Sequence, residues 1–201
     1  MHQYELPLVS GHVYHIYNRG VNSAPIFTKP DNYYFFLNQY ANYMADYVDT
    51  YAYCLMQNHF HLLIRIRDTL PDSSTHRKTG VHSAEQAVSK QFAKLFSSYT
   101  QAYNKVNART GALLESPFKR KLVEDEPYLT RLLCYIHFNP QRHGVSNFRT
   151  YPYSSYQSHL LLDRPTRLQR DYVLSWFGGP QGYVEAHLAS YADDENALQF
   201  D

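Results

Sequence analysis

The chain has 201 residues, of which 44% are hydrophobic and 18% charged, a composition that suits one folded domain with its own core. Mean hydropathy is negative and no apolar run approaches the roughly 20 residues of a membrane span, so we expect no membrane partner. The first residues lack both a basic and an apolar segment, and two cysteines are too few for a disulfide framework. These features predict a cytoplasmic protein without a signal peptide.

Charge is distributed unevenly along the chain, although the net charge is only +1. Residues 51–123 contain eleven Lys or Arg against four Asp or Glu, which gives +7, and both flanking segments are net negative. A basic middle segment can form a one-sided positive surface that attracts a polyanion such as nucleic acid. Basic residues that only solvate helix surfaces would give the same counts, so charge alone leaves both interpretations open.

Four segments rich in β-branched and aromatic residues predict β-strands. The first of these strands ends at Gly20. A short break at Gln57 and Asn58 separates the second from the third and predicts a hairpin. The predicted strands are residues 13–19, 50–56, 59–67 and 117–123.

Three segments with apolar residues at helical spacing predict helices. The first begins near Pro30, and the second follows a capping box of Ser83 and Gln86 and extends to Val106. The third opens at residues 124–127, and we expect it to end at residues 139–140, because the residue before a proline disfavours helical geometry.

The order strand, helix, strand, strand, helix, strand predicts an α+β, ferredoxin-like fold. In this split βαβ arrangement the sheet is antiparallel and both crossover helices lie on one face. The third helix is an addition to that core. We expect one domain over residues 1–157, with a mobile loop at 68–82, followed by a C-terminal helical extension at 158–201 whose role the sequence does not assign.

Two histidines stand two residues apart on the third predicted strand. His59 and His61 therefore share one face with Leu63, Arg65 and Arg67. Two imidazoles on a rigid strand can converge on one metal ion, and neighbouring arginines can bind a phosphate. Surface or structural histidines would produce the same tripeptide. The opposite face of the strand is apolar and should point into the core: Phe60, Leu62, Ile64 and Ile66.

A row of functional side chains follows one flank of the third predicted helix. At 100° per residue, Tyr128, Arg131, Tyr135 and Asn139 fall together beside the apolar stripe. A tyrosine is a poor nucleophile unless a cation or base lies nearby, and most tyrosines serve packing. Helical geometry alone therefore does not assign a catalytic role to Tyr135.

Several motifs recur in an order typical of the single-tyrosine HUH transposases. They are YNRG at 17–20, AYCLMQNHFHLL at 52–63, GALLESPFKRKLVEDE at 111–126 and LCYIHFNP at 133–140. The chain resembles the insertion-sequence-200-like group of these enzymes and, within it, the REP-associated tyrosine transposase branch. The resemblance covers about residues 11–67 and 84–157. Gln57 stands where the family usually has proline.

The resemblance implies a metal-dependent transposase or nickase that cleaves and rejoins single-stranded, hairpin-containing repeat DNA through a 5′-phosphotyrosine. At the matching positions, Tyr135 would be the nucleophile of the added helix, which would thus be the catalytic helix. His59 and His61 would bind a divalent ion, Mg²⁺ or Mn²⁺. Asn139 would be a third ligand, directly or through water.

Six cations are candidate DNA contacts. Three of them would grip backbone phosphates beside the metal, and three follow one another on the last predicted strand, with Lys119 and Lys121 on one face and Arg120 on the other. The six are Arg19, Arg65, Arg67, Lys119, Arg120 and Lys121.

Two other functions remain open from the sequence. One is a non-catalytic module that binds single-stranded nucleic acid on the same ferredoxin-like frame. The other is a metallohydrolase that uses His59 and His61 without a nucleophilic tyrosine. The sequence also leaves open whether the protein is a homodimer or a monomer.

Overall fold

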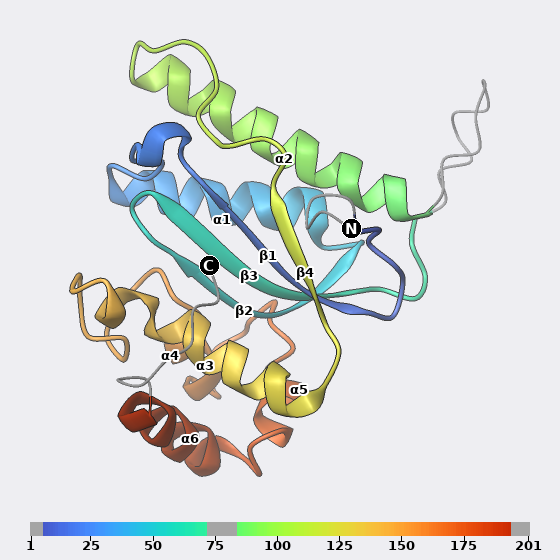
Figure 1. Cartoon of the computed structure of the whole chain (residues 1–201), viewed down its shortest axis with the longest axis vertical. Coiled ribbons are helices and arrows are strands. Elements are labelled where there is room, and N and C mark those ends of the chain that lie inside the picture. Colours follow the sequence, from blue (N-terminus) through green and yellow to red (C-terminus); the bar gives the residue numbers. More distant parts are fainter. Residues whose placement is uncertain (1–5, 72–83, 194–201) are drawn as a thin grey trace.

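The computed structural model describes residues 6–71 and 84–193, which form layers of helices on both faces of a four-stranded sheet (Figure 1). The strand order is β2-β3-β1-β4, and every pair of neighbours is antiparallel. This order matches the split βαβ arrangement, so the predicted ferredoxin-like fold is confirmed. The strands are β1 (Val13–Arg19), β2 (Val48–Leu55), β3 (His59–Ile66) and β4 (Lys119–Val123).

The two crossover helices, α1 (Pro30–Met44) and α2 (Ala84–Val106), pack together on one face of the sheet. The third helix, α3 (Glu126–Arg142), crosses the opposite face and contacts β2 and β3. The predicted positions of all three helices are therefore confirmed. Ser83 of the predicted capping box and residues 72–82 of the predicted loop lie outside the described residues.

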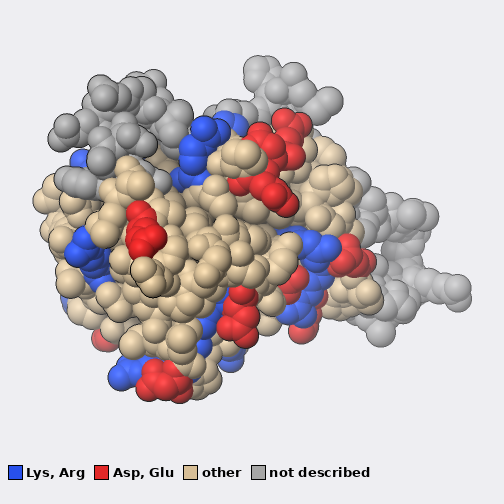
Figure 2. Space-filling view, turned by 90° about the horizontal axis from the view of Figure 1, so that it is seen from below, with Lys and Arg blue, Asp and Glu red and all other residues tan. Residues whose placement is uncertain are grey.

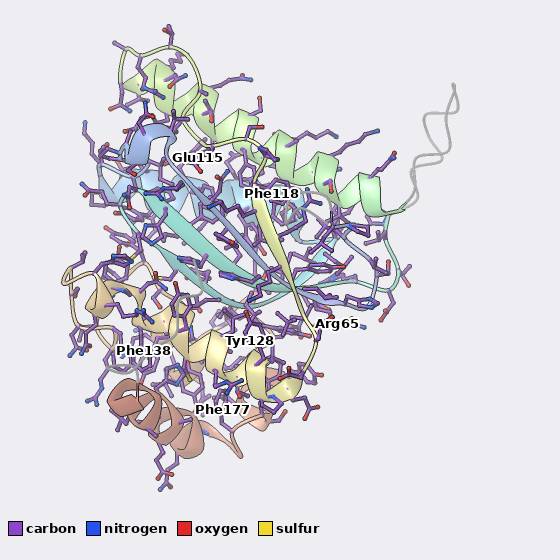
Figure 3. The ribbon with its side chains drawn as sticks, in the orientation of Figure 1. Arg65, Glu115, Phe118, Tyr128, Phe138 and Phe177 are labelled. Carbon is purple, nitrogen blue, oxygen red and sulfur yellow. The ribbon has the colours of Figure 1, made fainter. Side chains whose placement is uncertain are left out.

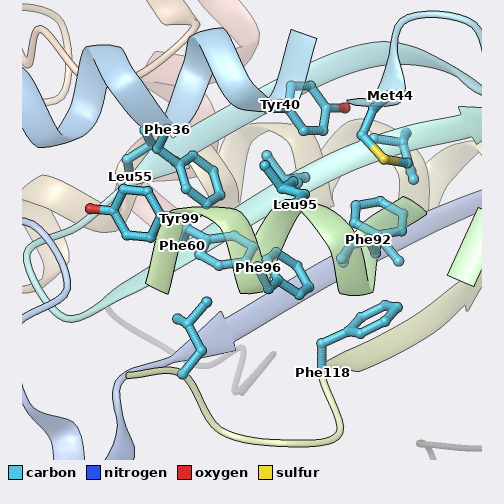
Figure 4. Close-up of a cluster of buried hydrophobic side chains, with 14 of the residues drawn as sticks. Phe36, Tyr40, Met44, Leu55, Phe60, Phe92, Leu95, Phe96, Tyr99 and Phe118 are labelled. Atoms are coloured by element: carbon cyan, nitrogen blue, oxygen red, sulfur yellow. The ribbon is translucent and has the colours of Figure 1, made fainter. Parts of the chain in front are cut away.

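The alternation of β3 determines which side chains face which layer. Phe60, Leu62, Ile64 and Ile66 are fully buried in the core under α1 and α2, as predicted. Figure 4 shows this core, in which Phe60 packs among aromatic rings from both helices. Because neighbouring residues of a strand point to opposite faces, His59 and His61 are directed towards α3.

The helix α3 does not end at Asn139 and Pro140, and that prediction is wrong. It runs to Arg142 with Pro140 inside its last turn. Proline has no N–H to donate to the Ile136 carbonyl four residues earlier. The side-chain amide of Asn139 lies 3.5 Å from that carbonyl and 3.0 Å from the carbonyl of Tyr135, and thus replaces the missing donor.

A C-terminal layer covers the outer side of α3 (Figure 1). Three helices form it where the sequence predicted an extension of short helices: α4 (Tyr156–Leu160), α5 (Arg170–Ser175) and α6 (Pro180–Asp193). The domain boundary expected after residue 157 falls inside α4. Because the sheet lies on one side of α3 and this layer on the other, every residue from 132 to 140 is buried.

None of the helices in the described parts of the chain is both long and apolar enough to cross a membrane.

Gly20 is the point where β1 meets the β2–β3 turn, and its replacement by alanine should be strongly destabilising. Its N–H donates to the Asn58 carbonyl at 2.8 Å, and a Cβ on Gly20 would overlap the Ala24 carbonyl oxygen. We expect Gly20→Ala to lower the free energy of unfolding by about 3 kcal/mol, because backbone must move. Gly144→Ala is the control: its φ of 64° costs about 1 kcal/mol, but a Cβ there meets open space. If urea unfolding gave the same loss of free energy of unfolding for Gly20→Ala and Gly144→Ala, this account would be contradicted.

Two buried histidines of the C-terminal layer predict sensitivity to acid. Burial lowers the pKa of His159 and of His187 from 6.5 to about 4. The unfolded chain therefore binds more protons below about pH 6.5, and the free energy of unfolding falls as the pH falls towards about 4. Between neutral pH and about pH 5, each of the two histidines should lower the free energy of unfolding by about 2 kcal/mol. Urea unfolding of His187→Gln should show a smaller decline than the wild type, and an unchanged decline would refute the assignment.

Candidate active site

The candidate site lies where the first residues of β3 face the C-terminal half of α3. The rings of His61 and Tyr135 are edge to face, with centroids 5.8 Å apart. The Nε2 atom of His59 is 3.4 Å from Oδ1 of Asn139. The rings of His59 and His61 are 5.2 Å apart. The four residues singled out from two distant motifs are thus brought together.

The carboxamide of Asn139 is held in one orientation. Its two contacts to the carbonyls of Tyr135 and Ile136 require an N–H donor, so Nδ2 faces the helix backbone. Oδ1 then points towards His59 with its lone pairs available. The proline at position 140 is what makes the Ile136 carbonyl available for this contact, so the Asn139–Pro140 pair of the sequence has a structural reason.

A neighbouring histidine fixes the ring of His61. Nδ1 of His61 lies 2.9 Å from Nε2 of His15 on β1, and both rings are fully buried. The other nitrogen of His61, Nε2, is buried and makes no hydrogen bond with the described residues. Burial, together with His15, His59 and His143, lowers the pKa of His61 well below 6.5, whereas Asn139 acts in the opposite direction. His61 is therefore neutral and has a nitrogen available for a ligand.

The ring of His59 is held in a similar way by its chain neighbour. Nδ1 of His59 is 2.7 Å from Oδ1 of Asn58, which can only accept, so the ring donates from Nδ1. In the neutral ring Nε2 then carries a lone pair, and this nitrogen faces Asn139. Asn58 is itself placed by the β2–β3 turn, where the Gln57 carbonyl accepts from Ile26 and Phe27.

The donor set fits a divalent metal ion. It consists of Nε2 of His59, Nε2 of His61 and Oδ1 of Asn139, of which the His61 nitrogen is a buried polar atom without a hydrogen bond. Two imidazoles and one amide oxygen suit ions of the Mn²⁺ type, and Mg²⁺ if waters and phosphate supply further oxygens. In residues 6–71 and 84–193 no three His, Cys, Asp or Glu side chains are grouped to hold a metal. A site in this region therefore depends on the amide.

Tyr135 lies between His61 and a cation. Its side chain is only 6% exposed, and the guanidinium carbon of Arg142, two turns further along α3, is 5.0 Å from its ring centroid. A nearby cation stabilises negative charge that develops on a phenol oxygen. The surroundings of Tyr135 thus include a cation of the kind that a tyrosine nucleophile would require.

A cavity of about 300 Å³ adjoins the two candidate histidines of β3. Both candidate histidines line it, together with Arg19, Lys119 and Tyr17. The side chain of Arg19 is half exposed and lies 3.9 Å from Glu115, and the Lys119 amine is 5.6 Å from the Tyr17 ring. Two cations at the rim of a cavity that contains the histidines can contact a phosphate chain.

The other two arginines predicted to lie beside the metal are elsewhere. Arg65 pairs with Asp68 at 2.7 Å and Asp49 at 3.7 Å, and Arg67 pairs with Asp49 at 3.0 Å. Arg65 is six residues along β3 from His59, a distance of roughly 20 Å in a strand. Figure 3 shows Arg65 and Glu115, the partner of Arg19, at opposite ends of the sheet. The expected position of Arg65 and Arg67 beside the metal is therefore wrong.

The three cations of β4 divide between the two faces as predicted. Lys119 and Lys121 lie over the rings of Tyr17 and Tyr128 on the α3 side. Arg120 points to the opposite face and is buried. Its guanidinium donates hydrogen bonds to the Leu6 carbonyl and the Ser89 hydroxyl. The prediction that Arg120 contacts DNA does not fit this placement. On the face seen in Figure 2, acidic and basic side chains are intermixed, so the basic middle segment forms no single patch there.

Four residues at the site were not singled out from the sequence. His15 and Tyr17 alternate on β1 and stack with His61, and Asn58 and His143 both contact His59. The β1–β3 register, which pairs Tyr17 with His61, was the missing information. A correct pairing of these two predicted strands would have placed His15 and Tyr17 on the histidine face.

No family model matches the chain. A Haemophilus influenzae protein that has the name REP-associated tyrosine transposase is 25% identical over 182 residues, which cover 81% of this chain and 96% of that protein. A solved structure of a REP-associated tyrosine transposase bound to a REP hairpin is 14% identical, with a TM-score of 0.54, and covers 83% of this chain and 90% of that one. The resemblance predicted from the motifs is thereby confirmed: the chain is similar in sequence to one REP-associated tyrosine transposase and similar in fold to another.

Proposed function

We propose that the protein is a transposase that cleaves and rejoins single-stranded DNA through Tyr135. The observation that carries this proposal is the convergence of His59 and His61 on β3 with Tyr135 and Asn139 on α3. A packing role would not require two imidazole nitrogens and an amide oxygen to face one another beside a phenol. The names of the relatives support the same reaction class.

His59, His61 and Asn139 would hold the divalent cation. A bound Mg²⁺ or Mn²⁺ would withdraw charge from a non-bridging oxygen of the scissile phosphate and so make the phosphorus more electrophilic. The chain itself orients the three donor atoms and keeps the ligand nitrogens of the two histidines unprotonated. Asn58 accepts the hydrogen of the His59 Nδ1 atom and so leaves Nε2 of that ring unprotonated. His15 would do the same for His61 by accepting from its Nδ1 atom.

Tyr135 would act on the phosphodiester by in-line attack. The phenol oxygen gives up its proton and forms a bond to phosphorus, while the bond from phosphorus to the 3′-oxygen breaks and that oxygen takes up a proton. The products are a 5′-phosphotyrosyl protein and a DNA strand with a free 3′-hydroxyl. Because one phosphodiester replaces another, a second 3′-hydroxyl can reverse or redirect the step without ATP.

Arg19 and Lys119 at the rim of the cavity would bind the phosphates that flank the cleaved bond. We propose hairpin-containing repeat DNA as the substrate class, since the related solved structure contains a REP hairpin. Lys121 extends the same cationic row along β4, towards Tyr128. Arg65 and Arg67, which are neutralised by Asp49 and Asp68, would contribute little.

The test is a cleavage reaction with labelled hairpin oligonucleotides, Mn²⁺ and the full chain, followed by denaturing electrophoresis. A label that remains on the protein, and that a chelator prevents, supports the proposal. Binding that is unaffected by chelator, without any adduct across a broad oligonucleotide set, would instead favour the non-catalytic module. Metal-dependent cleavage without a protein-linked label would favour a hydrolase that does not use the tyrosine.

A further inference from the structure

A second group of histidines is buried on the far side of α3 from the candidate site. It contains His137 on α3 and His187 on α6, and both rings are fully buried. Nδ1 of His137 lies 2.9 Å from Nε2 of His187, and Nε2 of His137 lies 2.8 Å from the hydroxyl of Ser155. Ser155 immediately precedes α4. We call Ser155, His137 and His187 the histidine relay.

The directions of the hydrogen bonds that link Ser155, His137 and His187 are determined; the Tyr183 hydroxyl, 3.3 Å from Nδ1 of His137, is a second and more distant partner of that nitrogen. Nδ1 of His187 is 2.7 Å from the Tyr183 carbonyl, which can only accept, so that nitrogen carries the proton. The neutral ring then accepts at Nε2, so His137 must donate from Nδ1 and accept at its own Nε2. Ser155 therefore donates to His137 and in turn accepts from the backbone N–H of Tyr53 at 2.9 Å.

The histidine relay joins four elements through one side chain of α3. It runs from Tyr53 on β2 through Ser155 to His137, and then through His187 to the backbone of α6. His137 stands two residues after Tyr135 and two before Asn139, about 200° around the helix from each. The relay thus holds the back of the helical turn whose front carries the proposed nucleophile and the amide ligand.

Apolar contacts are non-directional, so they define the rotation of a helix less sharply than hydrogen bonds do. Hydrogen bonds of 2.8 to 2.9 Å on both nitrogens of one ring fix both the rotation and the height of the helix. A nucleophile requires such precision, since a displacement of about 1 Å can reduce a rate about a hundredfold. Burial also lowers the pKa of His187 to about 4, so this ring is neutral at neutral pH.

We propose that the C-terminal layer positions Tyr135 and Asn139 for the reaction through the histidine relay. This inference rests on the proposed function, and it gives the extension that the sequence left unassigned a role in catalysis. His137, His187 and Ser155 are positioning residues, because their hydrogen bonds join α3 to α6 and to β2 on the side of α3 away from His59 and His61.

The test compares three variants of the full chain. His187→Leu places an apolar side chain of similar size there and removes the 2.9 Å acceptor for His137, which leaves Nδ1 of His137 only the Tyr183 hydroxyl at 3.3 Å. His187→Gln restores an acceptor near the position of Nε2. His159→Leu is the matched control, because His159 is equally buried and bonds to the Tyr51 carbonyl at 2.9 Å. Its ring lies 5.9 Å from that of His137, but the ring makes no hydrogen bond to Ser155, His137 or His187. The readouts are single-turnover adduct formation at saturating hairpin DNA and Mn²⁺, DNA affinity, Tm and hydrogen exchange of residues 133–139.

His187→Leu should slow adduct formation at least about tenfold with DNA affinity changed by less than about twofold, and His187→Gln should recover most of the rate. His159→Leu should lower the Tm by a similar amount but form the adduct at the wild-type rate. Equal rates in the two leucine variants would overturn the proposal. If the wild type forms no adduct, the proposed function fails, but hydrogen exchange still tests whether the relay holds α3. Faster exchange at residues 133–139 in His187→Leu alone would support that role of the relay. Equal exchange in both leucine variants would contradict it.

Discussion

Replacing Tyr135 with phenylalanine should abolish the covalent adduct with DNA. The substitution removes only the phenol oxygen, which is the atom that would bond to phosphorus, and it leaves the ring between His61 and Arg142. We expect adduct formation to fall at least about a thousandfold, because the substitution removes the atom that attacks phosphorus. Denaturing electrophoresis of the reaction with labelled hairpin DNA measures the loss.

The matched control is Tyr128→Phe on the same flank of α3. Tyr128 packs beneath Lys121, away from the histidine pair, so its variant should retain the adduct. Both variants should keep the Tm within about 2 °C and bind DNA as the wild type does. An adduct that survives in Tyr135→Phe would remove Tyr135 from the mechanism, whatever the other residues do.

Replacing His61 with leucine should separate metal binding from DNA binding. His61 provides the buried Nε2 atom that makes no hydrogen bond with the described residues, and leucine fills similar space without a ligand atom. We expect Mn²⁺ affinity and the cleavage rate to fall at least about a hundredfold, whereas the affinity for hairpin DNA, measured with chelator present, should change little. Isothermal titration with Mn²⁺ and a fluorescence binding assay measure the two properties.

His12→Leu serves as the control for His61→Leu. His12 directly precedes β1, next to Val13, which pairs with Arg65 at the end of the sheet away from His59. Its replacement should leave Mn²⁺ affinity and cleavage unchanged. Cleavage by His61→Leu at the wild-type rate, with the same dependence on Mn²⁺, would contradict the metal site.

Local patterns in the sequence were sufficient for the elements and for the faces on which the candidate site residues lie. The alternation of β3 placed Phe60 in the core and His59 on the other face, and helical spacing brought Tyr135 and Asn139 to one flank of α3. These relations depend only on the repeat of one strand or one helix. That is why they are visible in one chain without its partners.

The parts that failed depend on contacts between elements. Arg65 and Arg67 share a face with His61, but the length of β3 and the carboxylates of Asp49 and Asp68 separate them from the site. The proline rule ended α3 too early, because the Asn139 side chain replaces the donor that Pro140 lacks. Neither the ion pairs of these arginines nor the contact of the Asn139 side chain is visible in a local sequence pattern.

The C-terminal layer is the clearest example of this limit. Its histidines are far apart in the chain, and only the packing of α4 and α6 on α3 brings His137, His187 and Ser155 into hydrogen-bond contact. A sequence without the fold gives no reason to connect these residues with Tyr135.

The most direct test of the central claim is to identify the residue that carries DNA after the reaction. Trypsin cuts after Arg131 and Arg142, and the peptide between them, LLCYIHFNPQR, contains Tyr135 as its single tyrosine. Mass spectrometry of the wild-type adduct, after nuclease digestion, should find this peptide with a nucleotide on its tyrosine, only when Mn²⁺ or Mg²⁺ was present. A nucleotide on any other residue, or the unmodified peptide alongside cleaved DNA, would contradict the account.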